Sequence, residues 1–230
     1  MLNKKICVII INCGFVNYSC LRKHTSEILL DYKKMKLLLA THNNNKKKEI
    51  LDIFKDNGIK DIEIVTLEDL GDYEDIEETG LTFRENAFLK ASYGYSKYHL
   101  PTIGEDSGLE IDYLGGKPGI YSARYSGLGS EANIDKVLEE LKGVKKEERS
   151  CNFVCTICFF CDDLSHFFEG LCYGYIGFER QGNNGFGYDP IFMIDDKTSL
   201  AMLPEEKKNK ISHRYNAFSK LIDYLKDYPK

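Results

Sequence analysis

The stretch Ile103-Gly104-Glu105-Asp106-Ser107-Gly108-Leu109 places two adjacent carboxylates after a short apolar run, with a Ser-Gly pair directly behind them. We expect a strand that ends in a turn here, so that the acidic side chains lie at an edge of a sheet rather than in its core. Two carboxylates in such a place suit a hard divalent cation, and one of them can also polarise a water molecule. The alternative is an ordinary Asp-Ser-Gly hairpin turn with no chemical role.

A second acidic cluster, Glu77-Glu78-Thr79-Gly80, precedes the expected start of a helix. Thr82 and Glu85 have the spacing of a capping box, in which each side chain binds the backbone of the other residue. Glu78 becomes a further metal ligand if the fold brings it to Asp106, and a solvated acidic turn is the alternative. Four-residue spacing predicts the buried face of this helix at Ala87, Ala91 and Tyr95, with Phe88 beside them.

Upstream, the apolar run Leu37-Leu38-Leu39-Ala40 leads into a polar loop and then into a helix. Ile50, Ile53 and Phe54 mark the buried face of that helix, and Gly58 stands just past its end. Hydroxyl, amide and ammonium groups at a strand-to-helix turn suit the binding of phosphate, although the glycine-rich P-loop motif is absent. The polar residues of this loop are Thr41, His42, Asn43, Asn44, Asn45 and Lys46.

A glycine-rich segment, Asn183-Asn184-Gly185-Phe186-Gly187-Tyr188-Asp189-Pro190, lies in the last quarter of the chain. Glycines on both sides of an aromatic residue let the backbone pass close to a flat ligand, and Phe186 can stack on its ring. Asp189 precedes a proline, so we expect it to be extended with its side chain directed at a partner. The alternative is a glycine-rich hairpin.

The basic run Lys207-Lys208-Asn209-Lys210-Ile211-Ser212-His213-Arg214 precedes the last expected helix. Ser212 is its expected N-cap, which places His213 and Arg214 in the first turn. Cations favour the other end of a helix, so basic residues in the first turn indicate a nearby ligand, and a solvated basic segment is the alternative. The buried face of this helix is predicted at Phe218, Leu221, Ile222 and Leu225.

The remaining sequence indicates an α/β protein. Residues 62–65 alternate as a strand, residues 134–141 have helical spacing before Gly143, and residues 153–160 and 166–175 predict the two strands of a hairpin. A chain of 230 residues with 43% apolar content can bury one sizeable core. The net charge of −5 leaves no basic surface of the kind that binds duplex nucleic acid.

Four of the eight cysteines are close enough in sequence to suggest an iron–sulfur or zinc site. They are Cys151, Cys155, Cys158 and Cys161. The residues around them predict a strand, however, in which Cys155 and Cys161 face one side and Cys158 faces the other. That arrangement does not suit a tetrahedral metal, so we interpret these cysteines as small apolar residues in a reducing cytosol.

Five segments in this order resemble the inosine triphosphate pyrophosphatase family, also called Ham1-like: LLATHNNNKKKEI, EETGLTFRENA, EDSGLEIDYLGGKPGIYSARYSG, NNGFGYDPIF and KNKISHR. The resemblance runs from about Met35 to the C-terminus. It implies a twisted central mixed sheet flanked by helices, in two lobes with the active-site cleft between them. It also implies hydrolysis of inosine, deoxyinosine and xanthosine triphosphates to monophosphate and pyrophosphate, with Mg²⁺ as cofactor, by a cytoplasmic homodimer that cleanses the nucleotide pool.

Carried over by position, the phosphate-binding residues of that family fall on Thr41 through Lys46, and Asn43 and Lys46 match best. The metal carboxylates fall on Glu78 and Asp106; Asp106 also matches the general base, and Ser107 a substrate contact. Cationic His213 and Arg214, or nearby amides, can donate hydrogen bonds to the 6-oxo group of the purine. The base-binding residues fall on Phe186, Gly187, Tyr188, Asp189, Lys208, His213 and Arg214. Glu105 departs from the second aspartate of many bacterial relatives but keeps its charge.

Two other functions fit parts of the sequence: a nucleotide-binding sensor without turnover, and a cysteine-based metal or redox module. Intact Glu78, Asp106 and Lys46 argue against the sensor, because binding alone does not need the metal carboxylates. Residues 1–34 lie outside the resemblance, and we expect an N-terminal extension from an upstream start codon, followed by the catalytic domain at residues 35–230. Lys4-Lys5 and the apolar run after them imitate a signal peptide, so a targeting leader or anchor is the alternative, but the run is too short to span a bilayer.

Overall fold

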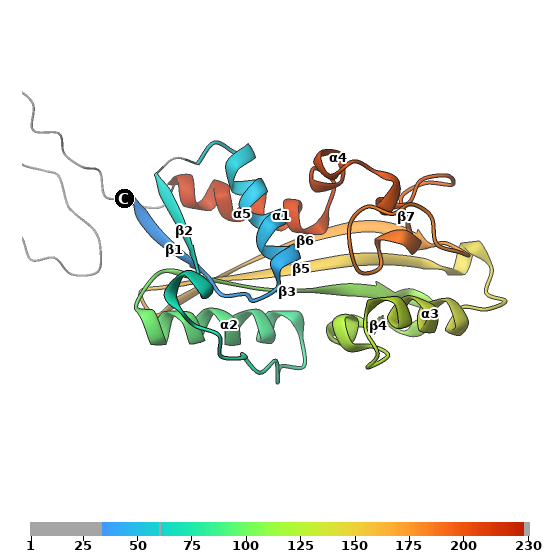
Figure 1. Cartoon of the computed structure of the whole chain (residues 1–230), viewed down its shortest axis with the longest axis horizontal. Helices are drawn as coiled ribbons and strands as arrows, with labels where there is room; N and C mark the ends of the chain where they lie inside the picture. Colours follow the sequence, from blue (N-terminus) through green and yellow to red (C-terminus); the bar gives the residue numbers. More distant parts are fainter. Residues whose placement is uncertain (1–33, 60, 228–230) are drawn as a thin grey trace, which may run out of the picture.

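The computed structural model of the chain describes residues 34–59 and 61–227, and within them seven strands form one sheet (Figure 1). The strands are β1 (Met35–Leu39), β2 (Ile62–Thr66), β3 (Thr102–Ile111), β4 (Lys117–Pro118), β5 (Ser150–Cys161), β6 (Leu164–Ile176) and β7 (Phe192–Met193). Their order is β2-β1-β3-β5-β6-β7, and β4 pairs with β3 outside that path. The expected mixed sheet is confirmed, because β1 is parallel to β2 and β3, whereas β5 is antiparallel to β3 and β6.

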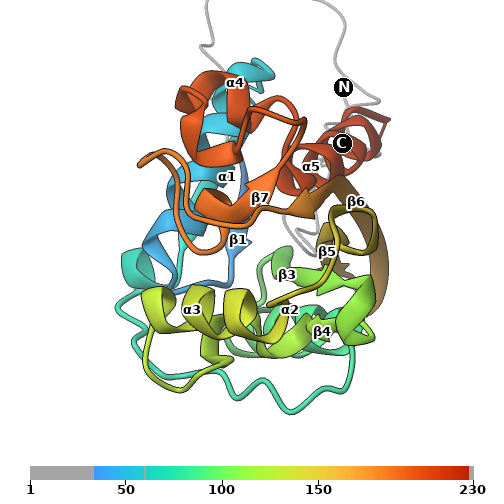
Figure 2. The same ribbon diagram turned by 90° about the vertical axis from the view of Figure 1, so that its right-hand side faces the viewer.

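Helices cover both faces of this sheet. In Figure 1, α1 (Asn44–Asp56) and α5 (His213–Asp227) lie above the sheet, and α2 (Phe83–Tyr98) lies below it. Farther along the strands, α3 (Ser130–Glu140) lies below and α4 (Glu205–Asn209) above, and Figure 2 shows the same two layers from the end. Helices therefore form at all four places where the sequence predicts them, and the predicted apolar faces of α1, α3 and α5 are turned inward. On α2, Ala87 and Ala91 are buried and Tyr95 is half-buried, but the prediction for Phe88 was wrong, because its side chain is exposed.

Two apolar cores lie at different positions along the long strands. The first packs α1 and α5 on the sheet and includes Ile103 at the beginning of β3. The second packs α3 and the C-terminal loops on the sheet and includes Leu109 near the end of β3. Glu105 and Asp106 therefore lie on the part of β3 that joins the two cores.

Two glycines let other elements approach β3 on either side of these carboxylates. A Cβ atom on Gly104 would lie 2.1 Å from the carbonyl oxygen of Ala87, so α2 could not pack this closely against any other residue. A Cβ atom on Gly108 would lie 2.4 Å from the carbonyl oxygen of Gly119, in the 3₁₀ segment η3 (Gly119–Arg124). The glycines thus bring α2 and η3 to the acidic pair.

The predicted Ser-Gly turn after Asp106 was wrong. β3 continues without a break from Thr102 to Ile111, because every residue in that span pairs with a residue of β5. Glu105 and Asp106 are buried at 1% and 5% exposure, whereas we expected them at a sheet edge. Their burial is possible because cations from three other elements neutralise them, a long-range contact that the local sequence does not contain.

Most local predictions are confirmed. Thr82 and Glu85 form the capping box, and Ser212 caps α5 by accepting a hydrogen bond from the amide of Tyr215 at 3.0 Å. The predicted hairpin is β5 and β6, longer than expected at both ends, with its turn at Asp162 and Asp163 in the left-handed region at φ 50° and 61°.

The cysteines of β5 lie on the faces that alternation predicts. Cys155 and Cys161 pack with residues of α5, whereas Cys158 packs with Ala87 and Ala91 on the opposite face. The predicted N-terminal extension at residues 1–34, with a leader or anchor as its alternative, lies outside the described residues except for residue 34. In the described ranges, none of the helices has the length and apolar character needed to cross a bilayer.

Candidate active site

Asp106 is held by two side chains of one helix. Its Oδ1 lies 3.1 Å from Nζ of Lys90, and its Oδ2 accepts a hydrogen bond from Nδ2 of Asn86 at 3.2 Å. Both partners project from α2, whose close approach depends on Gly104. Burial raises the pKa of Asp106, although the nearby charges of Lys90 and Lys46 oppose this.

Glu78 reaches the same ammonium group. One of its oxygens pairs with Nζ of Lys90, and the other lies 3.1 Å from Nη1 of Arg124. Burial alone would raise the pKa of Glu78, but the charges of Lys90 and Arg124 outweigh it and lower that pKa. Lys90 also donates to the backbone carbonyl of Glu105 at 3.0 Å. The structure thus brings Glu78 to Asp106, 28 positions later in the chain, as the metal-site prediction requires.

The two carboxylates have the chemistry and the convergence that a hard cation needs. Glu78 and Asp106 both contact the ammonium group of Lys90, so the two carboxylates converge on one cationic position. Across the described part of the chain, no group of three or more His, Cys, Asp or Glu side chains is arranged as a metal cage. An ion at this site would therefore complete its coordination with water and with oxygens of the substrate, as Mg²⁺ commonly does.

Glu105 is a third carboxylate, and it faces the opposite side of β3. Its Oε2 lies 2.9 Å from Nζ of Lys46, and its Oε1 lies 3.2 Å from Nη2 of Arg214. Burial opposes the ionised form of Glu105, but Lys46 and Arg214 outweigh it and hold its pKa well below the usual value. Glu105 therefore ties the phosphate-loop lysine to the first turn of α5.

Arg214 is almost fully buried, and both of its terminal guanidinium nitrogens have polar partners. Its Nη1 lies 2.6 Å from Oε2 of Glu49, and its Nη2 donates to Oγ of Ser107 at 3.0 Å. Glu49, on α1, also accepts a hydrogen bond from Ser212 at 3.0 Å. The predicted residues Ser107 and Arg214 are therefore in direct contact, although 107 positions separate them.

The phosphate-loop candidates surround the N-terminus of α1. Oδ1 of Asn43 caps the helix by accepting from the amides of Asn45 and Lys46, both at 3.1 Å. Thr41 Oγ1 accepts from the amide of Asn43 at 3.2 Å, and His42 Nε2 lies 2.9 Å from the carbonyl oxygen of Glu74. Asn44 and Asn45 are exposed in the first helical turn. The loop thus presents the N-terminus of a 13-residue helix, which attracts anions, next to Lys46.

The base-binding candidates gather around Asp189. Its Oδ2 lies 2.7 Å from Nζ of Lys208 and accepts from the amide of Phe186 at 2.8 Å. Asp189 begins the 3₁₀ turn η5 (Asp189–Ile191), so the prediction that it is extended was wrong, although its side chain does reach a partner. Burial raises the pKa of Asp189. The ammonium group of Lys208 lies 4.6 Å from the centre of the Phe186 ring. Gly187 adopts a left-handed φ of 60°, which favours glycine.

Tyr188 and His213 are enclosed by the second core. The hydroxyl of Tyr188 donates to the carbonyl oxygen of Ser122 at 2.9 Å, and the ring of His213 stacks on Phe153 at 4.8 Å. Burial and the neighbouring Arg214 charge lower the pKa of His213 well below its usual value. The expectation of a cationic His213 was therefore wrong, because an imidazolium in this apolar stack would lose its hydration.

Sequence reasoning missed four residues of this site: Glu49, Asn86, Lys90 and Arg124. Asn86 and Lys90 are four positions apart on α2, and each directly precedes one of the buried alanines, Ala87 and Ala91. Buried polar residues on the packed face of a helix were a usable signal for these two. Glu49 and Arg124 have no such local signal, since their roles depend on Arg214 and Glu78 from distant elements.

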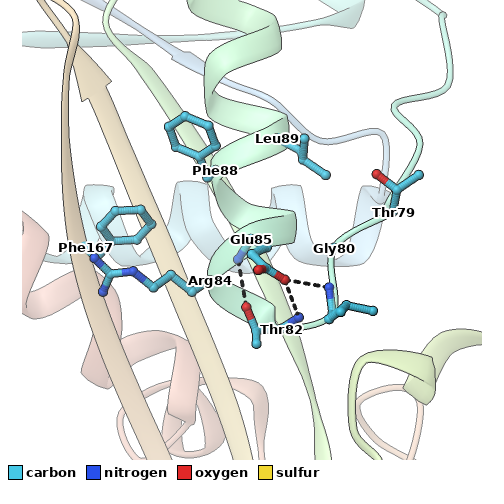
Figure 3. Close-up of a pocket in the computed structure, with 9 residues that line it drawn as sticks. Thr79, Gly80, Thr82, Arg84, Glu85, Phe88, Leu89 and Phe167 are labelled. Atoms are coloured by element: carbon cyan, nitrogen blue, oxygen red, sulfur yellow. Dashed lines mark hydrogen bonds between the residues drawn. The ribbon is translucent and has the colours of Figure 1, made fainter.

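An open pocket of about 590 Å³ lies beside the segment that carries Glu78, and it contains none of the predicted site residues. Figure 3 shows its walls, where the Arg84 guanidinium lies over the Phe167 ring at 3.6 Å. In the same view Glu85 closes the capping box by accepting from the amides of Leu81 and Thr82. The pocket is lined by the capping segment, by α2 and by Phe167 of β6, and not by the carboxylates on β3.

Known proteins resemble this chain over most of its length. The sequence profile of the Ham1 family matches residues 37–224. The dITP/XTP pyrophosphatase of Bacillus subtilis is 45% identical over 192 residues, covering 82% of this chain and 96% of that protein. The protein of the same name from Haemophilus influenzae is 46% identical over 198 residues, covering 84% and 100%.

Solved structures agree with the sequence comparison. A HAM1 protein from Coxiella burnetii has a TM-score of 0.76 and 35% identity, covering 84% of this chain and 99% of its own. The Ham1 protein of Staphylococcus aureus has a TM-score of 0.74 and 37% identity, covering 84% and 100%. At these identities and scores, both the fold and the sequence relationship are supported.

Proposed function

Because this chain belongs to the Ham1 family, we propose that it is a nucleoside triphosphate pyrophosphatase that hydrolyses inosine, deoxyinosine and xanthosine triphosphates to monophosphate and pyrophosphate. Removal of these nucleotides cleanses the pool from which nucleic acids are made. The observation that best supports the proposal is the convergence of Glu78 and Asp106 on one cationic position, next to a helix N-terminus suited to phosphate.

Mg²⁺ is the proposed cofactor, held by Glu78 and Asp106. A bound Mg²⁺ would neutralise negative charge on the phosphates as pyrophosphate leaves. Lys90 would add a second positive charge from the protein itself, since it remains charged: burial disfavours its ammonium form, but Asp106 and Glu78 raise its pKa.

Asp106 is the proposed general base. Its carboxylate would accept a proton from the water that attacks the phosphate chain, and Lys90 and Asn86 would hold it in a fixed orientation. The two hydrogen bonds therefore supply the orientation that a general base needs.

The triphosphate is proposed to lie between Lys46 and the first turn of α1. Thr41, His42, Asn43, Asn44 and Asn45 form the loop around it, and Ser107 borders it on β3. The positive end of the α1 helix dipole would attract the phosphates, and Lys46 adds a charge that does not depend on the base. These contacts would serve every nucleoside triphosphate equally.

Selection of the base is assigned to the cluster around Asp189. Phe186 would stack on the purine, with Gly187 and Tyr188 shaping the segment, while Lys208, His213 and Arg214 border its edge. A 6-oxo purine presents an acceptor where adenine presents an amino donor. Protein N–H groups that donate to the 6-oxo oxygen would find no acceptor on adenine. Leaving such buried donors without a hydrogen bond costs enough binding free energy for the site to reject adenosine triphosphate.

The active form is proposed to be a homodimer in the cytoplasm, with residues 35–230 as the catalytic domain. The family profile begins at residue 37 and so supports this domain boundary.

A panel of nucleotides tests the proposed function. The purified full chain is given Mg²⁺ and, separately, the triphosphates of inosine, deoxyinosine, xanthosine, adenosine and guanosine, and kcat/KM is measured for each. We expect the first three to be hydrolysed at least about 100-fold more efficiently than adenosine triphosphate, the discrimination that a few kcal/mol of lost hydrogen bonding provides. Equal hydrolysis of all five would contradict the base-selection part of the proposal.

A further inference from the structure

Arg124 occupies a position that neither the family resemblance nor the sequence motifs assigned to the site. It ends η3, and its Nη1 lies 3.1 Å from Oε2 of Glu78. Its side chain is 47% exposed, and its guanidinium lies 5.5 Å from the centre of the Tyr121 ring. The guanidinium therefore contacts a proposed metal ligand while it remains accessible to a ligand in solvent.

The backbone that carries Arg124 is fixed on several sides. The hydroxyl of Ser122 accepts from the amide of Leu109 at 2.9 Å and donates to the carbonyl of Gly119 at 2.6 Å. Nδ2 of Asn133 donates to the carbonyls of Ser122 and Ala123 at 3.2 and 3.1 Å. The segment is thus held against β3 and α3, so the exposed side chain projects from a rigid base.

The other cations of the site are held more tightly than Arg124. Lys90 and Arg214 are 8% and 1% exposed, and each contacts two carboxylates. Lys46 has a side chain 15% exposed and pairs with the fully buried carboxylate of Glu105. Arg124 makes one exposed ion pair, which solvent screens and which therefore contributes little to stability. Among these four cations, Arg124 is the one that can exchange its partner at low cost.

We propose that Arg124 exchanges partners during the catalytic cycle: it pairs with Glu78 in the free enzyme and binds the phosphate chain when Glu78 takes up the divalent cation. The exchange follows from charge, since a cation on Glu78 displaces the guanidinium and the phosphates bound to that cation offer it new oxygens. Guanidinium groups bind phosphate through paired hydrogen bonds, which makes arginine suited to this role. The identity of the phosphate ligand rests on the proposed function, but the competition for Glu78 does not.

The first test measures metal binding without nucleotide. Mn²⁺ is titrated into the wild-type chain and into Arg124→Ala, and free Mn²⁺ is followed by electron paramagnetic resonance. Removal of the competing guanidinium should tighten Mn²⁺ binding about two- to fivefold, the size of an exposed ion pair. Arg180→Ala is the matched control, because Arg180 is a partly exposed arginine paired with Glu131 and Asp135 on α3. Unchanged or weaker Mn²⁺ binding by Arg124→Ala would overturn the competition.

The second test measures the new partner. Pyrophosphate and inosine monophosphate are compared as inhibitors of inosine triphosphate hydrolysis by wild type, Arg124→Ala and Arg124→Lys. Loss of a charge-assisted contact should weaken inhibition by pyrophosphate about tenfold in Arg124→Ala, with little change for the monophosphate. The lysine variant should recover part of the loss, because it keeps the charge without the paired geometry. Equal effects on both inhibitors, or none, would overturn the phosphate contact.

The two tests separate failure of this inference from failure of the proposed function. If the wild-type chain hydrolyses none of the nucleotides, the proposed function is wrong, and the Mn²⁺ titration still decides whether Arg124 competes for Glu78.

Discussion

Asp106 depends on two neighbours from α2, and its replacement should separate catalysis from folding. Asp106→Asn keeps the size of the side chain, and its one carbonyl oxygen can accept a hydrogen bond from Lys90 or from Asn86 but not from both. The variant can neither accept a proton nor supply a negative charge to a cation. We expect turnover of inosine triphosphate to fall by about 10² to 10⁴-fold, which is the usual contribution of a positioned base. Steady-state kinetics measures the loss, and circular dichroism checks the fold.

Glu110→Gln is the matched control for that variant. Glu110 lies on the same strand but outside the site, where it accepts a hydrogen bond from Asn152 at 3.0 Å. Turnover by the Glu110→Gln variant should stay within about twofold of wild type, because surface changes away from the site have small effects. Near-wild-type turnover in a folded Asp106→Asn protein would remove Asp106 from the role of base.

Arg214 shows why the base-binding assignment needs a stability measurement as well. Replacement by alanine would leave the buried carboxylates of Glu49 and Glu105 without this partner. We expect Arg214→Ala to lower the free energy of unfolding by about 3–5 kcal/mol, the usual cost of breaking a buried ion pair. Urea denaturation measures it, and Arg180→Ala should lose no more than about 1 kcal/mol. A loss of similar size in both variants would show that the buried network does not depend on Arg214.

At the scale of elements, the segment that carries Glu78 is anchored by Asp72. Oδ2 of Asp72 accepts from the hydroxyls of Tyr93 and Tyr98 at 2.9 and 2.8 Å, and Oδ1 accepts from the amide of Glu74 at 3.0 Å. Burial alone would raise the pKa of Asp72, but these hydrogen bonds and Lys97 outweigh it and lower that pKa. The anchor joins the far end of α2 to the loop before Glu78.

Asp72→Asn should therefore weaken the anchor, and the resulting loss of stability should depend on pH. Because the folded-state pKa of Asp72 lies below the unfolded value of about 3.9, its stabilisation is complete above that pH and is lost as the pH falls below it. We expect the variant to be about 1–2 kcal/mol less stable at pH 7, with a smaller difference near pH 3. Urea denaturation at both pH values measures this, with exposed Asp75→Asn as control. A difference that grows toward low pH would contradict the assigned shift.

Elements whose ends have local signals could be predicted from the sequence. The capping box of α2, the N-cap of α5 and the apolar faces of α1 and α3 depend on residues within a few positions of each other. The course of β3 through Ser107 and Gly108 could not be predicted in this way. It depends on pairing with β5, about 50 positions later, and on buried cations that neutralise Glu105 and Asp106.

The candidate site shows the same division. Glu78 and Asp106 were predicted because acidic residues beside turns are visible in sequence, and family resemblance assigned their roles. Lys90, which joins them, was not predicted, because a lysine on a helix is ordinarily solvated and its burial becomes clear only when α2 packs on Gly104. Neutral His213 was mispredicted for a similar reason, since its stacking on Phe153 joins α5 to β5.

At the scale of the whole molecule, the catalytic domain is proposed to begin at Met35. β1 begins there, and the family profile begins at residue 37. We expect a protein that starts at Met35 to fold, to dimerise and to hydrolyse inosine triphosphate with kcat/KM within about twofold of the full chain, because such a change lies within about 0.5 kcal/mol. Size-exclusion chromatography and kinetics compare the two proteins. Loss of solubility or of activity on truncation would show that residues 1–34 contribute to the enzyme.

The central claim is that this site cleaves a triphosphate into monophosphate and pyrophosphate. The most direct measurement is ³¹P nuclear magnetic resonance of inosine triphosphate incubated with the purified chain and Mg²⁺, with Asp106→Asn in parallel. The account predicts equal amounts of inosine monophosphate and pyrophosphate from the wild type and almost none from the variant. Inosine diphosphate and inorganic phosphate as products, or equal hydrolysis by both proteins, would contradict it.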